Sequence, residues 1–196
     1  MPEVELPNPQ ELEEKAERSF GRRVALVTAI YAVILAIASL GGNNAMKDML
    51  LAQQQSSDQW AFYQAKVIRE HQYRAHKMRL ETELAERGAA LNPEVRQRYE
   101  ALLKQFVEEE KRYNAEKKEI EREAKKLEHE RDRNRDKDPY FDYAEVLLQI
   151  AIVMASVSIL SNSRPLFFFS LVLASSGAAL AINGFTLFFR LPVLHH

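Results

Sequence analysis

The sequence contains no cysteine, which excludes disulfide bonds, thiolate metal sites and a cysteine nucleophile. Glycine and proline are scarce, with 6 and 7 residues among 196, so little interrupts long helices. The net charge is only −1, so the protein has no overall field to attract nucleic acid or an anionic surface. These absences favour a helical protein and give no sign of a redox or catalytic centre.

Charge is missing altogether from three stretches of the chain. They run from Val24 to Gly42, from Val146 to Ser163 and from Pro165 to Phe189, and contain 19, 18 and 25 residues. A bilayer core is crossed by about 20 apolar helical residues, because a helix satisfies its own backbone groups in hydrocarbon. We therefore predict transmembrane helices at residues 23–42, 144–162 and 165–189.

A leader precedes the first of these helices, and a short tail follows the last. In the leader, residues 1–22, Asn8-Pro9 predicts the start of a short amphipathic helix. The tail is residues 190–196. Arg22-Arg23 and Arg164 favour a cytoplasmic N-terminus, which would put the long connection and the C-terminus outside. Arg190 and the basic residues before Asp138 favour the reverse, but on balance we predict a cytoplasmic N-terminus and an extracytoplasmic hairpin.

The connection between the first two apolar stretches, residues 43–139, predicts a long antiparallel helical hairpin that resembles a coiled coil. Gly41-Gly42-Asn43-Asn44 predicts the end of one helix and the start of the next. A second helix stop and restart falls near residues 87–93, at Gly88 and Asn92-Pro93. Asp138-Pro139 predicts the end of the hairpin. The fold class is therefore an all-α membrane protein with three spanning helices and one hairpin.

A heptad pattern in each half predicts how the hairpin packs. The second half carries apolar residues at Val95, Tyr99, Leu102, Phe106, Tyr113, Ile120 and Leu127. The first half carries a half-polar stripe of Trp60, Gln64, Val67, Ile68, His71, Ala75 and Met78. A turn centred near residue 90 then predicts that Trp60 faces Ile120, Val67 faces Tyr113, and Met78 faces Leu102.

The stretch from Gln53 to Lys66 holds the only tryptophan and almost no aliphatic residue. Its plain interpretation is hairpin core. The alternative is a contact surface between subunits or with a partner, where aromatic residues are enriched. A lone hairpin buries little area, so we predict a homo-oligomer. The candidate interaction residues are Trp60, Phe62, Tyr63, Gln64, Val67, His71, Phe106, Tyr113 and Ile120.

Other candidate sites are weak. The histidines lack the Glu-x-x-His spacing of di-metal helical sites, so no metal or cofactor is expected. The basic run from Lys66 to Arg79 faces acidic residues, which argues against nucleic acid. Polar residues inside membrane helices suggest function by default, and three occur here: Glu145, Gln149 and Asn183. Glu145 fits a boundary residue, and Asn183 fits an interhelical hydrogen bond.

The stretch SLGGNNAMKDMLLAQQQSSDQWAFYQAKVIREH resembles a family of bacterial membrane proteins catalogued only as a domain of unknown function. Asn43-Asn44 and the run from Ser57 to Lys66 are the most specific parts of this resemblance. The resemblance covers nearly the whole chain. It implies a bacterial inner-membrane location and supplies no catalytic residues.

The expected function is structural rather than enzymatic. We expect a scaffolding membrane protein that forms homo-oligomers and displays the helical hairpin for assembly or partner binding. Its partners would be itself, the lipid bilayer and other membrane proteins. The alternative is a subunit of a channel or transporter, with a polar path near Glu145, Gln149 and Asn183. A bound metal or cofactor would instead point to an enzyme.

Overall fold

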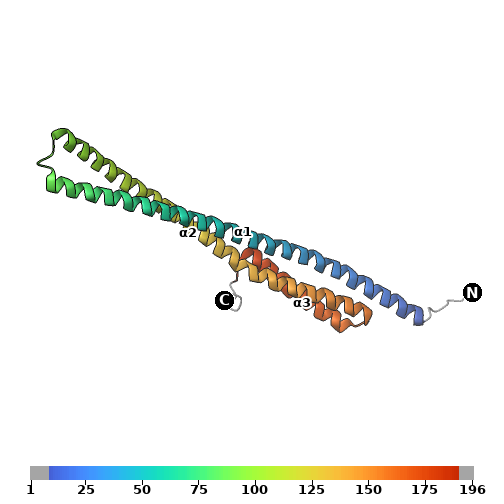
Figure 1. Ribbon diagram of the computed structural model, residues 1–196. Coiled ribbons are helices and arrows are strands. Elements are labelled where there is room, and N and C mark those ends of the chain that lie inside the picture. The colour runs from blue at the N-terminus through green and yellow to red at the C-terminus, as the bar shows by residue number, and fades with distance from the viewer. Residues whose placement is uncertain (1–8, 190–196) are drawn as a thin grey trace, which may run out of the picture. The chain divides into compact units, whose positions relative to one another are not determined.

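The computed structural model describes residues 9–189, and every regular element in that range is a helix. In chain order these are α1 (Pro9–Arg87), α2 (Pro93–Leu160) and α3 (Arg164–Thr186), shown in Figure 1. No strand occurs within this range, so the all-helical class with three long helices is confirmed. The first eight residues of the predicted leader and the tail 190–196 lie outside the described residues.

Two predicted helix breaks are wrong. α1 continues without interruption through Gly41-Gly42-Asn43-Asn44, and α2 continues through Pro139. Gly41 and Gly42 are buried against the ring of Phe141, so packing holds the helix where propensity alone would end it. Pro139 is followed at once by Tyr140 and Phe141, both fully buried, and this anchorage keeps the helix in place across the proline.

The helix ends near residue 90 fall where turn chemistry predicts them. α1 ends at Arg87, and the N–H of Gly88 still bonds to the carbonyl of Leu84 at 2.9 Å. The side chain of Asn92 accepts a hydrogen bond from the N–H of Glu94 at 3.0 Å, which caps the start of α2.

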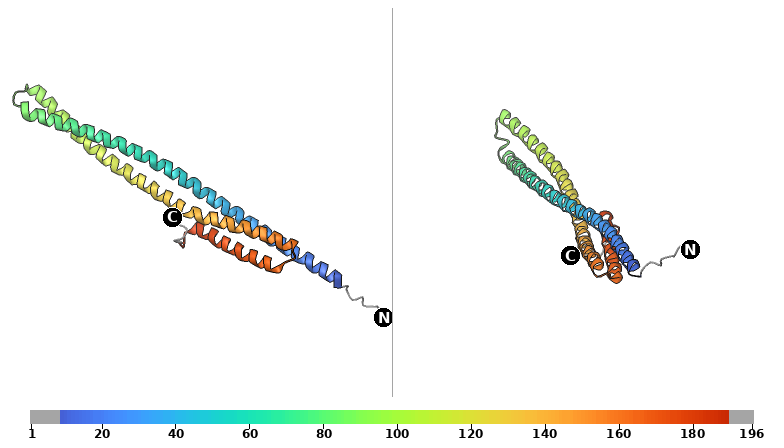
Figure 2. Two further views of the ribbon diagram at one scale, coloured as in Figure 1. Left: turned by 60° about the horizontal axis from the view of Figure 1, so that its bottom comes forward. Right: turned by 90° about the vertical axis from the view of Figure 1, so that its right-hand side faces the viewer.

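The chain divides into two compact units, and α1 and α2 contribute to both. The apolar unit comprises the described residues up to Asp48 and from Arg133 onward. The charged unit is Met49–Asp132. Within the apolar unit, α3 lies alongside the last part of α2, as both views of Figure 2 show.

Small side chains build the core of the apolar unit. Its buried cluster is Val24, Tyr31, Ala38, Ala144, Leu148, Ala151, Ala155, Ala174 and Ala181. The bulky ring of Phe141 lies between Gly41 of α1 and Gly184 of α3, and it meets Phe185 edge-on at 4.9 Å. Because alanine and glycine let helix backbones approach closely, this unit packs through backbone proximity.

The outer surface of the apolar unit remains apolar. Each of the three helices contains an 18-residue window long and apolar enough to cross a membrane, by length and composition. Fewer than a third of the residues in each window are buried. Large apolar side chains such as Leu26, Val33 and Val153 therefore face outward.

Candidate functional site: the faces of the charged unit

One row of side chains on each helix holds the charged unit together. On α1 the buried or half-buried row is Ala52, Ser56, Gln59, Tyr63, Lys66, Glu70, Tyr73, Lys77, Leu80 and Leu84. On α2 it is Tyr99, Leu103, Phe106, Glu110, Tyr113, Lys117, Ile120, Ala124, Leu127 and Arg131. Both rows alternate steps of four and three residues, the coiled-coil repeat. We call the two rows together the seam.

The heptad prediction holds better for α2 than for α1. Phe106, Tyr113 and Ile120 lie in the seam. The predicted α1 stripe is wrong, because the seam lies one residue earlier. It contains the residues just before Trp60, Gln64, Val67, His71 and Met78. Gln64 and His71 are consequently exposed, while their neighbours Tyr63 and Glu70 face α2.

The predicted pairing of the two helices is also displaced. Trp60 bonds to Glu128 rather than facing Ile120, and Tyr113 stacks on Tyr73 rather than on Val67. Helical side chains lean toward the N-terminus of their own helix. In an antiparallel pair, side chains that meet therefore belong to residues numbered higher than a symmetric turn would predict.

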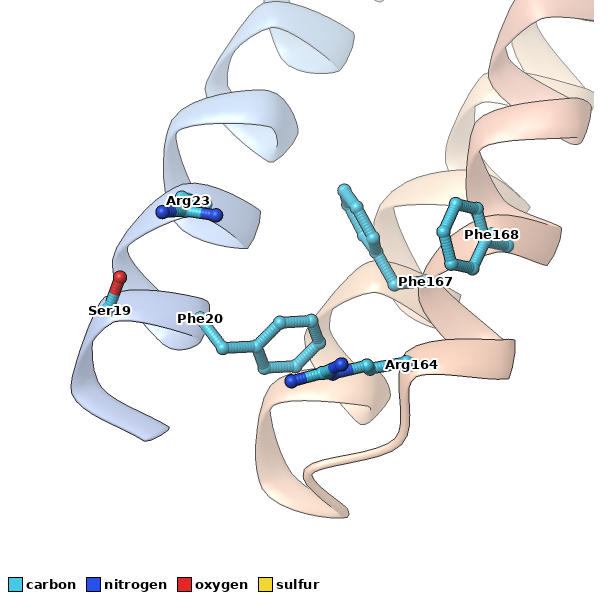
Figure 3. Close-up of a pocket in the computed structure, with 6 residues that line it drawn as sticks. All are labelled: Ser19, Phe20, Arg23, Arg164, Phe167 and Phe168. Atoms are coloured by element: carbon cyan, nitrogen blue, oxygen red, sulfur yellow. The ribbon is translucent and has the colours of Figure 1, made fainter. Parts of the chain in front are cut away.

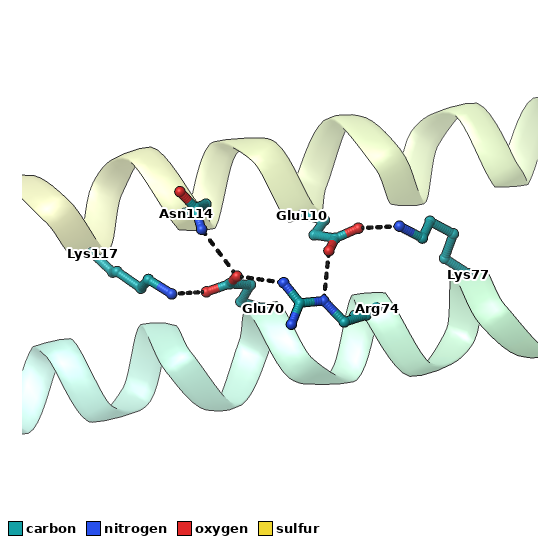
Figure 4. Close-up of polar contacts among 6 residues, drawn as sticks. All are labelled: Glu70, Arg74, Lys77, Glu110, Asn114 and Lys117. Atoms are coloured by element: carbon teal, nitrogen blue, oxygen red, sulfur yellow. Dashed lines mark hydrogen bonds and ion pairs between the residues drawn. The ribbon is translucent and has the colours of Figure 1, made fainter.

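Glu70 is the most buried charged residue of the seam, with its side chain only 2% exposed. Its carboxylate accepts hydrogen bonds from Lys117 and from the amide of Asn114, the latter at 3.1 Å. Arg74, one turn along α1, donates to the same carboxylate at 3.0 Å. Figure 4 shows these donors converging on Glu70 from both helices.

Arg74 continues the network to a second carboxylate. Its Nε donates to Glu110 at 2.7 Å, and Lys77 donates to the other oxygen of Glu110 at 2.6 Å (Figure 4). Farther from the turn, Lys66 pairs with Glu116. The seam thus alternates acid and base on both helices, and a shift of register would bring like charges together.

Hydrogen bonds and nearby positive charge keep these acids ionised. The hydrogen bond from Lys117 lowers the pKa of Glu70 below its ordinary value of 4.5, against the opposing effect of burial. Lys77 and Arg74 lower the pKa of Glu110 in the same way. Polar groups in a helical interface can specify its register, and these ion pairs join α1 to α2 in one register.

The predicted pairing of the basic run Lys66–Arg79 with acidic residues is confirmed, since Arg74 and Lys77 both pair with Glu110. The buried acid Glu70 was not predicted, because only apolar residues were expected in the seam. A four-three frame that admits charge recovers it: Leu80, Lys77, Tyr73, Glu70 and Lys66 are successive members of one row. The same frame on α2 shows the matching row of opposite charges.

An aromatic cluster lies beside the ion pairs. Tyr113 stacks on Tyr73 at 5.5 Å between ring centroids, and Phe106 contacts Tyr73 at 6.0 Å and His76 at 5.7 Å. Three cationic side chains lie within 5.9 Å of the Tyr113 ring: Lys66, Arg69 and Arg112. Phe106 and Tyr113 therefore contribute to the hairpin's own packing.

The remaining aromatic candidates divide between the interior and the surface. The indole N–H of Trp60 donates to Glu128 at 2.9 Å, and its ring meets Tyr63 edge-on at 5.4 Å. Val67 is half-buried on the flank of the seam, whereas Phe62 is 59% exposed. Of the aromatic residues near Gln53–Lys66, Phe62 is the one that remains open to a partner.

A second four-three row runs along the outside of α1. It consists of Leu50, Gln54, Ser57, Ala61, Gln64, Ile68, His71, Ala75, Met78, Thr82 and Ala85, and every member is exposed. None is an acid, a lysine or an arginine, although 34 of the 84 residues in this unit are charged. We call this row the outer stripe of α1.

The equivalent row on α2 has the opposite character. It consists of Ala101, Lys104, Glu108, Lys111, Ala115, Lys118, Arg122, Lys125 and His129, all exposed. Six of these nine carry a formal charge. The outer face of α2 is therefore charged, whereas the outer stripe of α1 carries no formal charge over five heptads.

The polar candidates in the apolar unit do not converge on one feature. Glu145 is half-buried beside Gly42, and Gln149 is exposed one turn farther on. The side-chain amide of Asn183 donates to the carbonyl of Phe189 at 2.7 Å and accepts from its N–H at 2.9 Å. Asn183 thus caps the end of α3 instead of forming the predicted interhelical hydrogen bond.

Within residues 9–189, no group of three or more histidine or acidic side chains could hold a metal ion. The candidate features of the described residues are surfaces: the ion-paired seam and the uncharged outer stripe of the charged unit, and the apolar faces of the other unit.

These features define an all-helical protein whose long helices combine apolar stretches with a charged, coiled-coil-like pair. The chain belongs to the family described as Domain of unknown function (DUF4337), which matches residues 20–187. This match confirms the resemblance to a family without an assigned activity. No curated protein and no solved structure matches the chain.

Proposed function

We propose that the protein is an integral membrane scaffold that assembles with copies of itself through the outer stripe of α1. The bacterial inner membrane is the location we infer, with the apolar unit in the bilayer and the charged unit in water. The outer stripe carries this proposal. The stripe is 36 residues long and uncharged on a helix otherwise rich in charge, and six of its eleven members are apolar, so a second helix can cover it without burying a formal charge.

Membrane insertion is supported by the exposed surface of the apolar unit. Leu26, Ile30 and Val33 on α1 are each more than half exposed, as are Val153 on α2 and Val172 on α3. Exposed apolar surface on this scale is costly in water and favourable in hydrocarbon. Three helices of sufficient length provide the means of spanning.

A second copy of the chain is the partner that the outer stripe fits best. The outside of α2 is charged, so it would leave charges unpaired against the stripe. Copies anchored in one membrane stand parallel, and parallel stripes align Gln64 with Gln64 and His71 with His71. Small residues at Ala61 and Ala75 allow the two helices to approach closely.

The test uses one substitution on two faces. Ala75→Lys places a charge in the outer stripe, whereas Ala115→Lys places the same charge at the equivalent exposed position of α2. Both variants are purified in mild detergent, and the molar mass of each oligomer is measured by light scattering. We expect Ala75→Lys to dissociate the oligomer and Ala115→Lys to keep it. Equal masses for both variants would refute the stripe as the interface.

Disulfide trapping gives an independent check, because the natural chain has no cysteine. A cysteine at Ala75 should form a covalent dimer under mild oxidation if the Cα atoms of two copies come within about 7 Å. A cysteine at Ala115 should not. Efficient dimer formation at both positions would indicate random collision in the membrane.

Sidedness is tested at the turn. A single cysteine at Ala90, an exposed residue between α1 and α2, is treated with a membrane-impermeant maleimide in intact and lysed cells. Labelling in intact cells agrees with the predicted extracytoplasmic hairpin. Labelling only after lysis would reverse the orientation and direct the search to cytoplasmic partners.

The channel or transporter alternative has less support. Both hydrogen-bonding groups of the Asn183 amide are engaged by Phe189, and Gln149 faces outward from the unit. Glu145 alone remains half-buried beside another helix. Ion flux through reconstituted protein that is abolished by Glu145→Gln would favour this alternative over the scaffold.

A further inference from the structure

A cavity of about 410 Å³ opens at one end of the apolar unit, between α1 and α3. Its lining is Ser19, Phe20, Arg23, Arg164, Phe167 and Phe168. Figure 3 shows Arg164 reaching from the start of α3 toward α1, beside the Phe20 ring, with Arg23 on the facing helix. The cavity thus combines two guanidinium groups with three phenyl rings.

The two guanidinium groups lack an internal counter-ion. Among the side chains that the structure describes, no carboxylate forms an ion pair with Arg23 or Arg164 within 4.0 Å. Glu17 of α1 lines an adjoining cavity with Phe20 and Arg164. Its carboxylate accepts a hydrogen bond from the Asn162 side chain at 2.8 Å and forms no ion pair with either arginine. The positive charge at this cavity is therefore available to a ligand.

Apart from Ser19, the rest of the lining consists of phenyl rings. The Phe20 and Phe167 rings meet edge-on at 6.0 Å, which joins α1 to α3 across the floor. Phe168 is 64% exposed and extends the apolar lining outward. A ligand that fits must offer an anion to the arginines and hydrocarbon to the rings.

The cavity lies where a membrane boundary is expected. Arg23 directly precedes the apolar run of α1, and Arg164 directly precedes that of α3. The bond between Glu17 and Asn162 brings the start of the one run and the loop before the other to the same end of the unit. Arginines at such boundaries meet the phosphate layer of the bilayer.

We propose that this cavity binds the headgroup phosphate of an anionic phospholipid between Arg23 and Arg164, with an acyl chain against Phe167 and Phe168. Guanidinium groups bind phosphate through paired, charge-assisted hydrogen bonds. This inference rests on the proposed membrane location.

The experiment measures lipid binding to the full-length protein in mild detergent by native mass spectrometry, with phosphatidylglycerol and phosphatidylcholine as probes. We expect preferential binding of phosphatidylglycerol to the unaltered protein. Arg23→Gln with Arg164→Gln should lower that preference about tenfold, since each basic group contributes separately. Arg22→Gln removes an adjacent exposed arginine outside the cavity and should change it less than about twofold.

Additional variants and controls distinguish a failure of the lipid-binding inference from a failure of the proposed function. Arg23→Lys with Arg164→Lys keeps the charge and should retain part of the preference, which shows that the site still folds. An unchanged preference in the double glutamine variant would overturn the inference, as would complete competition by millimolar inorganic phosphate. A protein that leaves the membrane fraction on alkaline washing would overturn the proposed function itself.

Discussion

The two units solve the same packing problem by opposite means. In the apolar unit, helices approach through alanine and glycine, and one aromatic ring, Phe141, fills the space that Gly41 and Gly184 leave. In the charged unit, the seam contains lysine and glutamate, and ion pairs such as Glu70–Lys117 set the register. Shape specifies the first interface, and charge specifies the second.

The difference follows from the surroundings we propose for each unit. In hydrocarbon an apolar seam gains nothing over an apolar exterior, so close contact of backbones must provide the specificity. In water an apolar row would bring the two helices together, but it would fix their relative register only weakly. Charges placed within the row remove that ambiguity, at some cost in stability. Four experiments can break or sharpen this contrast.

The largest effect is expected for Gly41→Ala. A Cβ at this position would lie 2.6 Å from a ring carbon of Phe141, which cannot retreat because Gly184 receives its other side. Overpacking of this kind costs about 1–3 kcal/mol. The measurement is thermal unfolding of the full-length protein in mild detergent, followed by circular dichroism.

Gly21→Ala is the matched control for that substitution. Its Cβ would meet Ile159 at 3.7 Å, an ordinary contact. Alanine should therefore stabilise the helix here by up to about 1 kcal/mol through propensity. If both alanine variants were equally stable, the glycine–phenylalanine contact would not be what holds the apolar unit together.

The next effect is expected for Glu70→Ala in the charged unit. The change leaves Lys117 and Asn114 without their shared acceptor in a nearly buried position. The cost of such orphaned groups is about 1–3 kcal/mol. Fluorescence of Trp60, the only tryptophan, reports unfolding of this unit separately from the other.

Glu119→Ala tests whether the burial of Glu70 is the reason for the loss of stability expected in Glu70→Ala. Glu119 pairs with Arg122 on the surface of α2, and both side chains are more than 60% exposed. Exposed pairs contribute about 0–1 kcal/mol, so this variant should unfold close to the unaltered protein. Similar losses for Glu70→Ala and Glu119→Ala would show that the seam ion pairs are no more valuable than surface ones.

A smaller effect is expected from mild acid. The pKa values of Glu70 and Glu110 are lowered in the folded protein, mainly by hydrogen bonds from lysine. Their stabilisation is complete above the ordinary pKa of 4.5 and is lost as the pH falls through the lower folded values. The free energy of unfolding reported by Trp60 fluorescence should stay constant from pH 7 to 5 and decrease below pH 4.5.

The Glu70→Ala variant should lose less stability on the same acid titration, because one of the groups responsible is gone. The apolar unit has no ion pair of this kind among its buried core residues, so its unfolding should respond less to acid. Parallel decline of both units would remove the distinction between them.

The extent to which sequence predicted this fold differs between the two halves of the charged unit. On α2 the aromatic residues Phe106 and Tyr113 mark the seam clearly. On α1 the seam positions are held by Ser56, Lys66 and Glu70, which a search for apolar residues discards. Five of the seven residues of the predicted half-polar stripe belong instead to the exposed outer stripe: Gln64, Ile68, His71, Ala75 and Met78.

Helix boundaries also show where prediction from the sequence fails. Gly88 and Asn92-Pro93 mark a turn, and the structure has a turn there. Gly41-Gly42 carries the same local signal and lies inside a helix, because Phe141 from α2 needs the space. Local sequence cannot distinguish a glycine that ends a helix from one that receives a neighbour. The outer stripe likewise emerged only once exposure fixed the heptad frame.

The smallest effect is expected for Ser56→Ala, a buried hydroxyl in the seam. Its oxygen lies 3.5 Å from the Ala124 carbonyl, long for a hydrogen bond of this type. Alanine also has the higher helix propensity. The free energy of unfolding reported by Trp60 fluorescence should therefore increase by less than about 0.5 kcal/mol. A loss above about 1 kcal/mol would show a full-strength hydrogen bond at Ser56. The charged unit would then depend on close polar contact between helices as well as on charge, and the contrast with the apolar unit would narrow.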